Sequence, residues 1–206
     1  LIEDLLKKLT LKSRASFNEF QLKEDRNKIL NELKIRGYYS AELEVFSINQ
    51  SKNIIDIVYE IKLGEKAGIK KIKFTGNKVF KDSKIKSIII SEEYKPWKFI
   101  SGKKYLNENI ISIDNRLLKN FYLNKGYYNV KINSSFAKVI DDQNFELIFN
   151  INANEKYYFN DLSLDLPIEY EKSNYNKIFS LFSSYKSKPY SINKIEKILE
   201  KIDAIT

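Results

Sequence analysis

Apolar residues follow two spacings along the chain, one typical of helices and the other of strands. Leu22, Ile29, Leu30 and Leu33 fall at helical spacing with polar residues between them, which predicts an amphipathic helix. After Gly37 apolar residues recur at every second position over residues 39–45, so a strand is expected where the helix ends. The polar residues 49–53 separate this strand from a second one at 54–63, and the two are predicted to form a hairpin.

This pattern occurs twice, at a constant offset of 89 residues. Residues 25–45 align with residues 114–134 without a gap, and Gly-Tyr-Tyr stands at 37–39 in the first copy and at 126–128 in the second. We expect each glycine to end a helix, and the two tyrosines after it to place one ring in the core and one at the surface. A match that spans a helix end and the following strand indicates tandem structural units.

The repeat extends towards both ends of the chain. Residues 188–202 share with residues 103–118 a polar and aromatic start followed by a helical apolar stripe. We therefore expect three units, at 1–64, 65–155 and 156–206, of which the first lacks its first strand and the third lacks its hairpin. The pattern predicts an α+β fold of tandem β-α-α-β-β units, each a three-stranded sheet covered on one face by two helices, in a piece of a longer protein.

The stretch around Gly76-Asn77 begins the middle unit, which is the complete one. Residues 72–74 alternate as in a strand, and the glycine is expected to end it. A helix through residues 85–89 should follow, with Asp82 or Ser83 as its N-cap. A phosphate-binding loop is not expected, because neither the G-x-x-x-x-G-K-[ST] nor the G-x-G-x-x-G pattern is present.

The composition removes the usual agents of catalysis. The 206 residues include neither cysteine nor histidine, which excludes thiolate nucleophiles, disulfides and the commonest general base and metal ligand. Asp141-Asp142 and Glu92-Glu93 could act as acid–base pairs, but adjacent carboxylates in a polar stretch are more typical of solvated turns. We expect no enzyme activity, no cofactor and no metal site. No apolar run approaches the roughly eighteen residues that cross a bilayer as a helix.

The net charge of +9 is concentrated in the middle unit, where 17 basic residues stand against 10 acidic ones. Lysines near Gly76 form a cluster that could contact an anionic lipid surface, although a solvated face is the alternative. A nucleic-acid-binding repeat protein is a further alternative, but its basic stripe should continue into the flanking units, which are nearly neutral. No nucleic-acid partner is therefore expected. The candidate lipid patch comprises Lys70, Lys71, Lys73, Lys78 and Lys81.

The middle unit resembles the POTRA family of polypeptide-transport-associated modules. The resemblance rests on "IKKIKFTGNKVF" at 69–80 and "FYLNKGYYNVKI" at 121–132, and "YKPWKFISGKKY" at 94–105 is similar to the third module in the arm of outer-membrane assembly factors. By the same resemblance, the flanking units correspond to a second module without its first strand and a fourth module without its hairpin. Residues 157–170 depart from the pattern, because no Gly-Asn follows the first strand.

The resemblance implies a scaffold with a chaperone-like role on the periplasmic face of a Gram-negative outer membrane. Its expected partners are unfolded outer-membrane proteins, accessory lipoproteins and a membrane barrel at the C-terminal end of the same protein. The corresponding arms of TamA or of two-partner secretion transporters are the alternatives.

The resemblance also places the strand after Gly126 at a sheet edge, where an extended partner can add a strand by β-augmentation. The sequence suits this role, because polar residues alternate with apolar ones and no proline interrupts pairing. The charge of Lys131 should discourage indiscriminate aggregation. The predicted partner-binding edge strand consists of Tyr128, Asn129, Val130, Lys131, Ile132, Asn133, Ser134 and Ser135.

A second candidate contact is the aromatic pair Trp97 and Phe99. An exposed aromatic anchor would bind a partner, whereas a buried plug between helices or units is the alternative.

Overall fold

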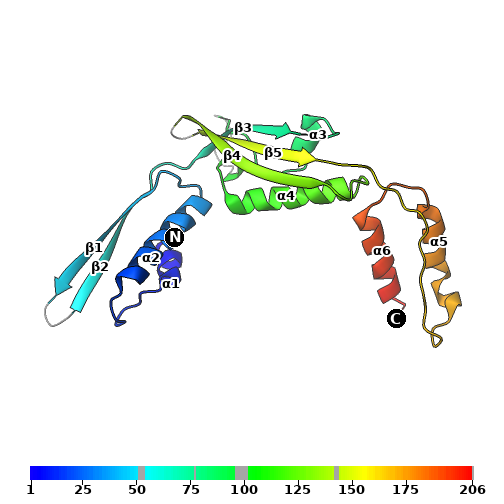
Figure 1. The fold of residues 1–206 in the computed structure, drawn as a ribbon, viewed down its shortest axis with the longest axis horizontal. Helices are drawn as coiled ribbons and strands as arrows, with labels where there is room; N and C mark the ends of the chain where they lie inside the picture. Colours follow the sequence, from blue (N-terminus) through cyan, green and yellow to red (C-terminus); the bar gives the residue numbers. More distant parts are fainter. Residues whose placement is uncertain (51–53, 77, 96–101, 142–143, 206) are drawn as a thin grey trace. The chain divides into compact units, whose positions relative to one another are not determined.

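Groups of helices and groups of strands follow one another along the chain in a computed structural model, which describes residues 1–50, 54–76, 78–95, 102–141 and 144–205 (Figure 1). The helices are α1 (Ile2–Lys8), α2 (Glu19–Ile35), α3 (Asp82–Lys86), α4 (Glu108–Leu123), α5 (Asn176–Tyr185) and α6 (Ile192–Asp203). The strands are β1 (Glu42–Gln50), β2 (Ile54–Lys62), β3 (Gly68–Thr75), β4 (Lys131–Asp141) and β5 (Asn144–Asn152). Short 3₁₀ turns lie at Gly102–Lys104 and Lys172–Tyr175.

The chain divides by its internal contacts into two compact parts. One comprises Leu1–Ile72, Ile90–Ser112 and Phe136–Leu147, and the other comprises Lys73–Ile89, Ile113–Ser135 and Ile148–Thr206. These boundaries fall inside the middle repeat, and the division into three repeats at 1–64, 65–155 and 156–206 stays a prediction.

The strands form two sheets. β1 and β2 pair as the predicted antiparallel hairpin, from Glu42 opposite Lys62 to Gln50 opposite Ile54. The other sheet has three strands in the order β3-β5-β4, and α4 runs along one of its faces (Figure 1). The α+β class and the three-stranded sheet of the middle repeat are confirmed, and β3 and β4 form the two edges of that sheet.

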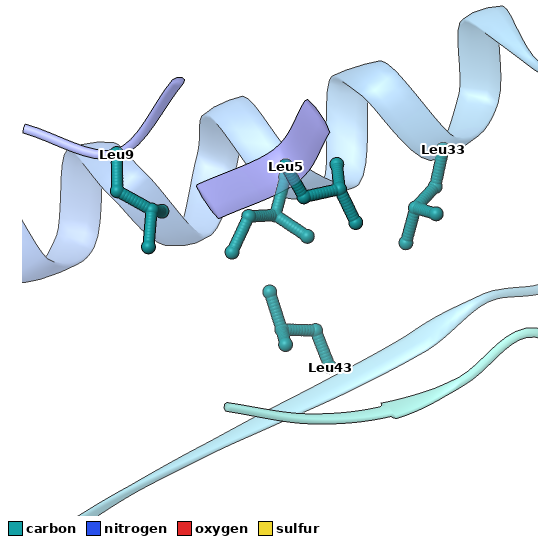
Figure 2. Packing of buried hydrophobic residues seen from close by; sticks show 5 residues of the cluster. Leu5, Leu9, Leu33 and Leu43 are labelled. Carbon is teal, nitrogen blue, oxygen red and sulfur yellow. The ribbon is translucent and has the colours of Figure 1, made fainter. Parts of the chain in front are cut away.

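Leucine side chains hold α1 and α2 against the first hairpin. Leu5 of α1, Leu33 of α2 and Leu43 of β1 point into one space in Figure 2, and Leu9 lies beside them. Leu33 has no exposed surface. Because burying one such side chain is worth about 1.5–3 kcal/mol, this cluster fixes the helices over the hairpin.

The central strand β5 is the most buried strand of the three-stranded sheet. Leu147, Phe149 and Ile151 have no exposed surface, so this face of β5 lies in the core. Phe149 stacks on Phe74 of β3, with ring centroids 5.6 Å apart. Tyr122 of α4 is also fully buried and donates its phenolic hydrogen to the carbonyl oxygen of Lys78, so this polar group in the core is satisfied.

The C-terminal helices pack around a cluster of their own. α6 buries Ile198 against Tyr175, Ile178 and Phe182, which confirms the helical stripe predicted there. The first strand expected for the third unit does not form over residues 159–167, although alternate leucines of that segment pack against the cluster. The alternating pattern is present, but among the described residues no neighbouring strand pairs with it.

The helix after Gly76 is shorter than predicted. α3 begins at Asp82 with Lys81 as its N-cap, so neither Asp82 nor Ser83 is the cap, and it ends at Lys86 instead of continuing to residue 89. The cause is a tighter turn, in which the N–H group of Ile88 bonds to the carbonyl oxygen of Ile85 at 3.0 Å.

Asp25 of α2 is a buried carboxylate that anchors the loop after α1. Its oxygens accept hydrogen bonds from the N–H groups of Thr10, at 2.8 and 2.9 Å, and Leu11, at 2.8 Å, while Lys28 Nζ lies 3.3 Å away. Burial by itself raises the pKa of Asp25, but these hydrogen bonds outweigh burial and hold the pKa below its ordinary value. Asp114, its equivalent in the second copy, is also fully buried.

The glycine that ends α2 also contacts the start of the second repeat. Gly37 has φ +94°, and the Tyr38 N–H group bonds back to the carbonyl oxygen of Leu33 at 2.9 Å, as in a Schellman helix end. The Gly37 oxygen accepts a hydrogen bond from Ala67 at 2.9 Å, and the Ala67 oxygen accepts one from Leu106 at 2.8 Å. A Cβ at Gly37 would lie 2.6 Å from the Leu106 oxygen.

The same arrangement recurs at Gly126, which has φ +99°. Its oxygen accepts a hydrogen bond from Tyr157 at 2.8 Å, and the Tyr157 oxygen accepts one from Tyr190 at 2.9 Å. A Cβ at Gly126 would lie 3.0 Å from the Tyr157 oxygen. The expectation that these glycines only end helices is therefore incomplete, because each also brings the backbones of successive repeats into contact.

The two tyrosine pairs behave differently. Tyr128 is 55% exposed while Tyr127 packs against Phe80 inside, as predicted. Tyr39 instead lies half-buried, with its ring 5.3 Å from that of Phe145 and its hydroxyl donating to Glu108 at 3.4 Å. Burial, together with the Glu108 carboxylate, raises the pKa of Tyr39.

Replacing Asp25 with Asn should lower the free energy of unfolding at neutral pH by about 1–3 kcal/mol, because buried N–H groups lose a charged acceptor. The folded pKa lies below the unfolded one, so the contribution is complete above about pH 4 and is lost as the pH falls through the folded pKa. Urea unfolding should show a difference that stays constant from about pH 7 to about pH 4 and shrinks at lower pH. Glu24→Gln, exposed on the same helix, is the control, and a pH-independent difference would contradict this role of Asp25.

Gly37→Ala should destabilise the protein more than Gly102→Ala. A Cβ at Gly102 meets nothing within 4 Å. At Gly37 it adds about 1–2 kcal/mol of left-handed backbone strain and must also displace the Leu106 carbonyl. Urea unfolding of the two variants, side by side, measures the difference. Equal stability of the two variants would contradict this expectation, because it would show that the Leu106 carbonyl group moves away from a Cβ at Gly37 at little energetic cost.

Candidate strand-pairing interface

The first four residues of β4 alternate in burial as predicted. Lys131 and Asn133 are exposed, whereas Ile132 and Ser134 are half-buried. Ser134 faces α4, because Asn115 of that helix donates a hydrogen bond to its hydroxyl oxygen at 2.7 Å. One face of the strand therefore packs on the helix and the other is in solvent. Ser135 belongs to β4, but its side chain lies outside the described residues.

Among the residues that the structure describes, no strand lies at the outer edge of β4, which pairs with β5 in the three-stranded sheet. Within residues 131–134, which the structure describes, no backbone group enters a hydrogen bond outside regular helices and strands. Outward main-chain groups of such a strand are available to a further strand.

The edge at β3 is different, because the chain itself occupies it. The Tyr94 N–H group donates to the carbonyl oxygen of Ile69 at 2.6 Å, and Gly68 forms an isolated bridge with Tyr105. The Ile72 N–H group donates to the carboxylate of Glu93 at 3.0 Å. A partner strand would have to displace these bonds before it could pair with β3.

Three of the eight residues predicted for the edge strand lie before it. β4 begins at Lys131, and Tyr128 and Asn129 form a turn that Val130 follows. The reason is local, since the Val130 N–H group bonds to the carbonyl oxygen of Tyr127 at 3.3 Å and delays the strand. In the first repeat β1 likewise begins at Glu42, after a corresponding turn.

A hollow of about 690 Å³ lies at the start of β4. Lys119 of α4 forms one wall, the residues from Tyr128 to Lys131 form another, and Asn154 and Tyr157 lie in the segment after β5 that completes it. Lys119, Asn154 and Tyr157 were not singled out from the sequence. The repeat does not mark Tyr157, because at the offset of 89 residues it aligns with Gly68, whereas its hydrogen bond to Gly126 is equivalent to that of Ala67 to Gly37.

The lysine cluster near Gly76 is partly engaged within the protein. Lys78 pairs with Asp82 and donates to the carbonyl oxygen of Phe74 at 3.1 Å, and Lys73 also has an interaction partner. The exposed candidates for lipid contact are Lys70, Lys71 and Lys81. Lipid binding by this cluster stays a prediction.

The remaining candidates give no further site. Trp97 and Phe99 lie outside the described residues. Glu93 supports β3 through its bond to Ile72, and the side chains of Asp141-Asp142 also lie outside the described part. In the part of the chain that the structure describes, no three acidic residues gather as a metal site would require, and no helix is long and apolar enough to span a membrane.

Proteins with similar sequences are named as assembly factors. The outer membrane protein assembly factor BamA of Buchnera aphidicola subsp. Acyrthosiphon pisum is 24% identical over 204 residues, which cover 98% of this chain and 32% of that protein. BamA of Neisseria meningitidis serogroup B is 25% identical over 132 residues, which cover 64% of this chain and 17% of that protein. The match thus spans about a third of the length of the Buchnera protein and a smaller part of the Neisseria protein.

The fold is shared with a solved structure, and the family follows from a sequence model. The crystal structure of Haemophilus influenzae BamA POTRA3-5 matches 98% of this chain and 79% of its own chain, with a TM-score of 0.56 and 12% identity. The POTRA family model, described as a surface antigen variable number repeat, matches residues 3–64 and 67–155. Since these two matches cover well over half of the chain, the protein belongs to the POTRA family.

Proposed function

We propose that this chain is part of the periplasmic arm of a machine that assembles outer-membrane proteins. Support comes from its POTRA family and from relatives named as outer membrane protein assembly factors. In this role the chain acts as a scaffold without enzyme activity at the periplasmic face of the outer membrane. Its partners are unfolded outer-membrane proteins and accessory lipoproteins.

The unequal edges of the three-stranded sheet are the observation that carries the proposed mode of binding. β3 is hydrogen-bonded to Glu93 and Tyr94 and bridged to Tyr105 of the same chain, whereas residues 131–134 of β4 have no such bonds to other described residues. An extended partner can therefore add to β4 without breaking an existing interaction. This is β-augmentation, in which main-chain hydrogen bonds supply affinity.

Main-chain pairing suits a site that must bind partners of many different sequences. Every residue except proline offers the same N–H and C=O groups, so an unfolded protein can be held without recognition of a fixed motif. The solvent face of β4 is polar at Lys131 and Asn133, which limits pairing between copies of the protein itself.

β1 occupies the equivalent place in the first repeat, 89 residues before β4. It belongs to a two-stranded hairpin that α1 and α2 support through the leucine cluster, whereas β4 lies in a three-stranded sheet packed on α4.

Asn133→Pro should weaken binding of an unfolded outer-membrane protein by about tenfold, because proline removes an N–H group and its ring obstructs a neighbouring strand. Main-chain groups along a strand alternate between its two sides, so Ile132→Pro tests the adjacent position. Asn133→Ala is the matched control, since it removes the same side chain and keeps the donor. Binding is measured by fluorescence anisotropy, after circular dichroism has shown that each variant is folded. Unchanged affinity in both proline variants would exclude pairing at this edge.

A further inference from the structure

Two tyrosine rings in the hollow at the start of β4 are held in place by the protein itself. Tyr128 is 55% exposed and Tyr157 is 41% exposed, with ring centroids 6.1 Å apart and planes at 64°. Asn129 donates a hydrogen bond to the Tyr157 hydroxyl at 2.8 Å, and the Tyr128 ring also packs edge-on against Tyr190, with centroids 5.1 Å apart. Because both rings are already ordered, a third aromatic ring can join them at little entropic cost.

Lysines lie on the same hollow. Lys119 and Lys131 line it and are exposed, and neither has a carboxylate partner among the described residues. Glu155 is the acidic residue in the lining, so the hollow keeps a net positive charge. On a strand added to β4, the residue opposite Lys131 lies on the same face as the lysine side chain, and a negative charge at that position is favourable.

We propose that this hollow selects, in the strand that pairs with β4, an aromatic residue next to an acidic one. The aromatic ring packs against Tyr128 and Tyr157, and the carboxylate faces Lys131. Neighbouring residues of a strand point to opposite faces, as the buried Val130 and the exposed Lys131 do here. One residue of the pair can thus face the tyrosine rings while the next faces Lys131, which also lines the hollow. The inference rests on the proposed strand-pairing function and adds a sequence preference to it.

A single-stranded nucleic acid also offers a flat ring next to a negative charge. A polypeptide is favoured because the hollow leads into a strand whose outer N–H and C=O groups match another strand. A sugar–phosphate backbone has no alternating donors and acceptors to pair with them.

The test measures binding of fluorescein-labelled peptides to the whole 206-residue chain by fluorescence anisotropy. The parent peptide alternates Val and Thr and carries one adjacent Tyr-Glu pair. A second peptide has Ala in place of that Tyr, and a third has Gln in place of that Glu. The unmodified protein should bind the parent about tenfold more tightly than the Ala peptide and about threefold more tightly than the Gln peptide.

Variants of the protein assign each preference to a side chain. Tyr128→Ala should abolish the preference for the aromatic peptide, and Lys131→Gln should abolish the preference for the acidic one. Tyr158→Ala is the matched control, because Tyr158 is 57% exposed and lies outside the lining; it should keep both preferences. Tyr128→Leu keeps an apolar contact with Tyr190 and replaces the Ala variant if circular dichroism shows that the latter is unfolded.

The outcomes separate this inference from the function on which it rests. If the parent and Ala peptides bind the unmodified protein equally and Asn133→Pro abolishes binding of both, selection is overturned and strand pairing stands. If every peptide binds both Asn133→Pro and Ile132→Pro with unchanged affinity, strand pairing is overturned and the inference falls with it. If a short oligothymidine displaces the parent peptide at lower concentration, and does so only when Tyr128 is present, the hollow is a nucleic-acid site instead.

Discussion

A glycine carbonyl oxygen joins each repeat of this chain to the next. The oxygen of Gly37 accepts a hydrogen bond from Ala67, and that of Gly126 accepts one from Tyr157. A left-handed residue turns the chain at the helix end, and the missing Cβ leaves room for the neighbouring backbone. The start of each following repeat is set by this contact. At Gly126 the contact also positions Tyr157, and with it one wall of the hollow at β4.

Satisfied and unsatisfied main-chain groups decide where the molecule can accept a partner. The bonds of Tyr94 and Glu93 to β3 use one edge of the sheet internally, so binding there would exchange one hydrogen bond for another. At β4 the outward N–H and C=O groups exchange hydrogen bonds to water for hydrogen bonds to the partner. The free energy of binding is then favourable when the partner also buries apolar side chains. The asymmetry follows from the chain itself, because Glu93, Tyr94 and Tyr105, which stand between β3 and α4 in the sequence, bond or bridge to β3.

Local signals in the sequence were enough to predict the repeat, the hairpins, the ends of α2 and α4, and the alternating burial of Ile132 and Asn133. Glycine and the change from helical to strand spacing act over a few neighbouring residues, so they can be read from the chain alone. The loop anchor at Asp25 and the wall residue Lys119 depend on groups far away in sequence, and no local pattern marks them. The start of β4 was misplaced because turn hydrogen bonds after Gly126 compete with strand pairing.

The joint between repeats uses peptide groups on both sides, so it places almost no demand on side-chain identity. Alanine stands at position 67 and tyrosine at position 157, yet both donate the same hydrogen bond. A gene segment that encodes one repeat can therefore be duplicated without requiring new side-chain contacts between the copies. The copies can then drift apart in sequence, provided that each keeps a glycine at the end of its second helix.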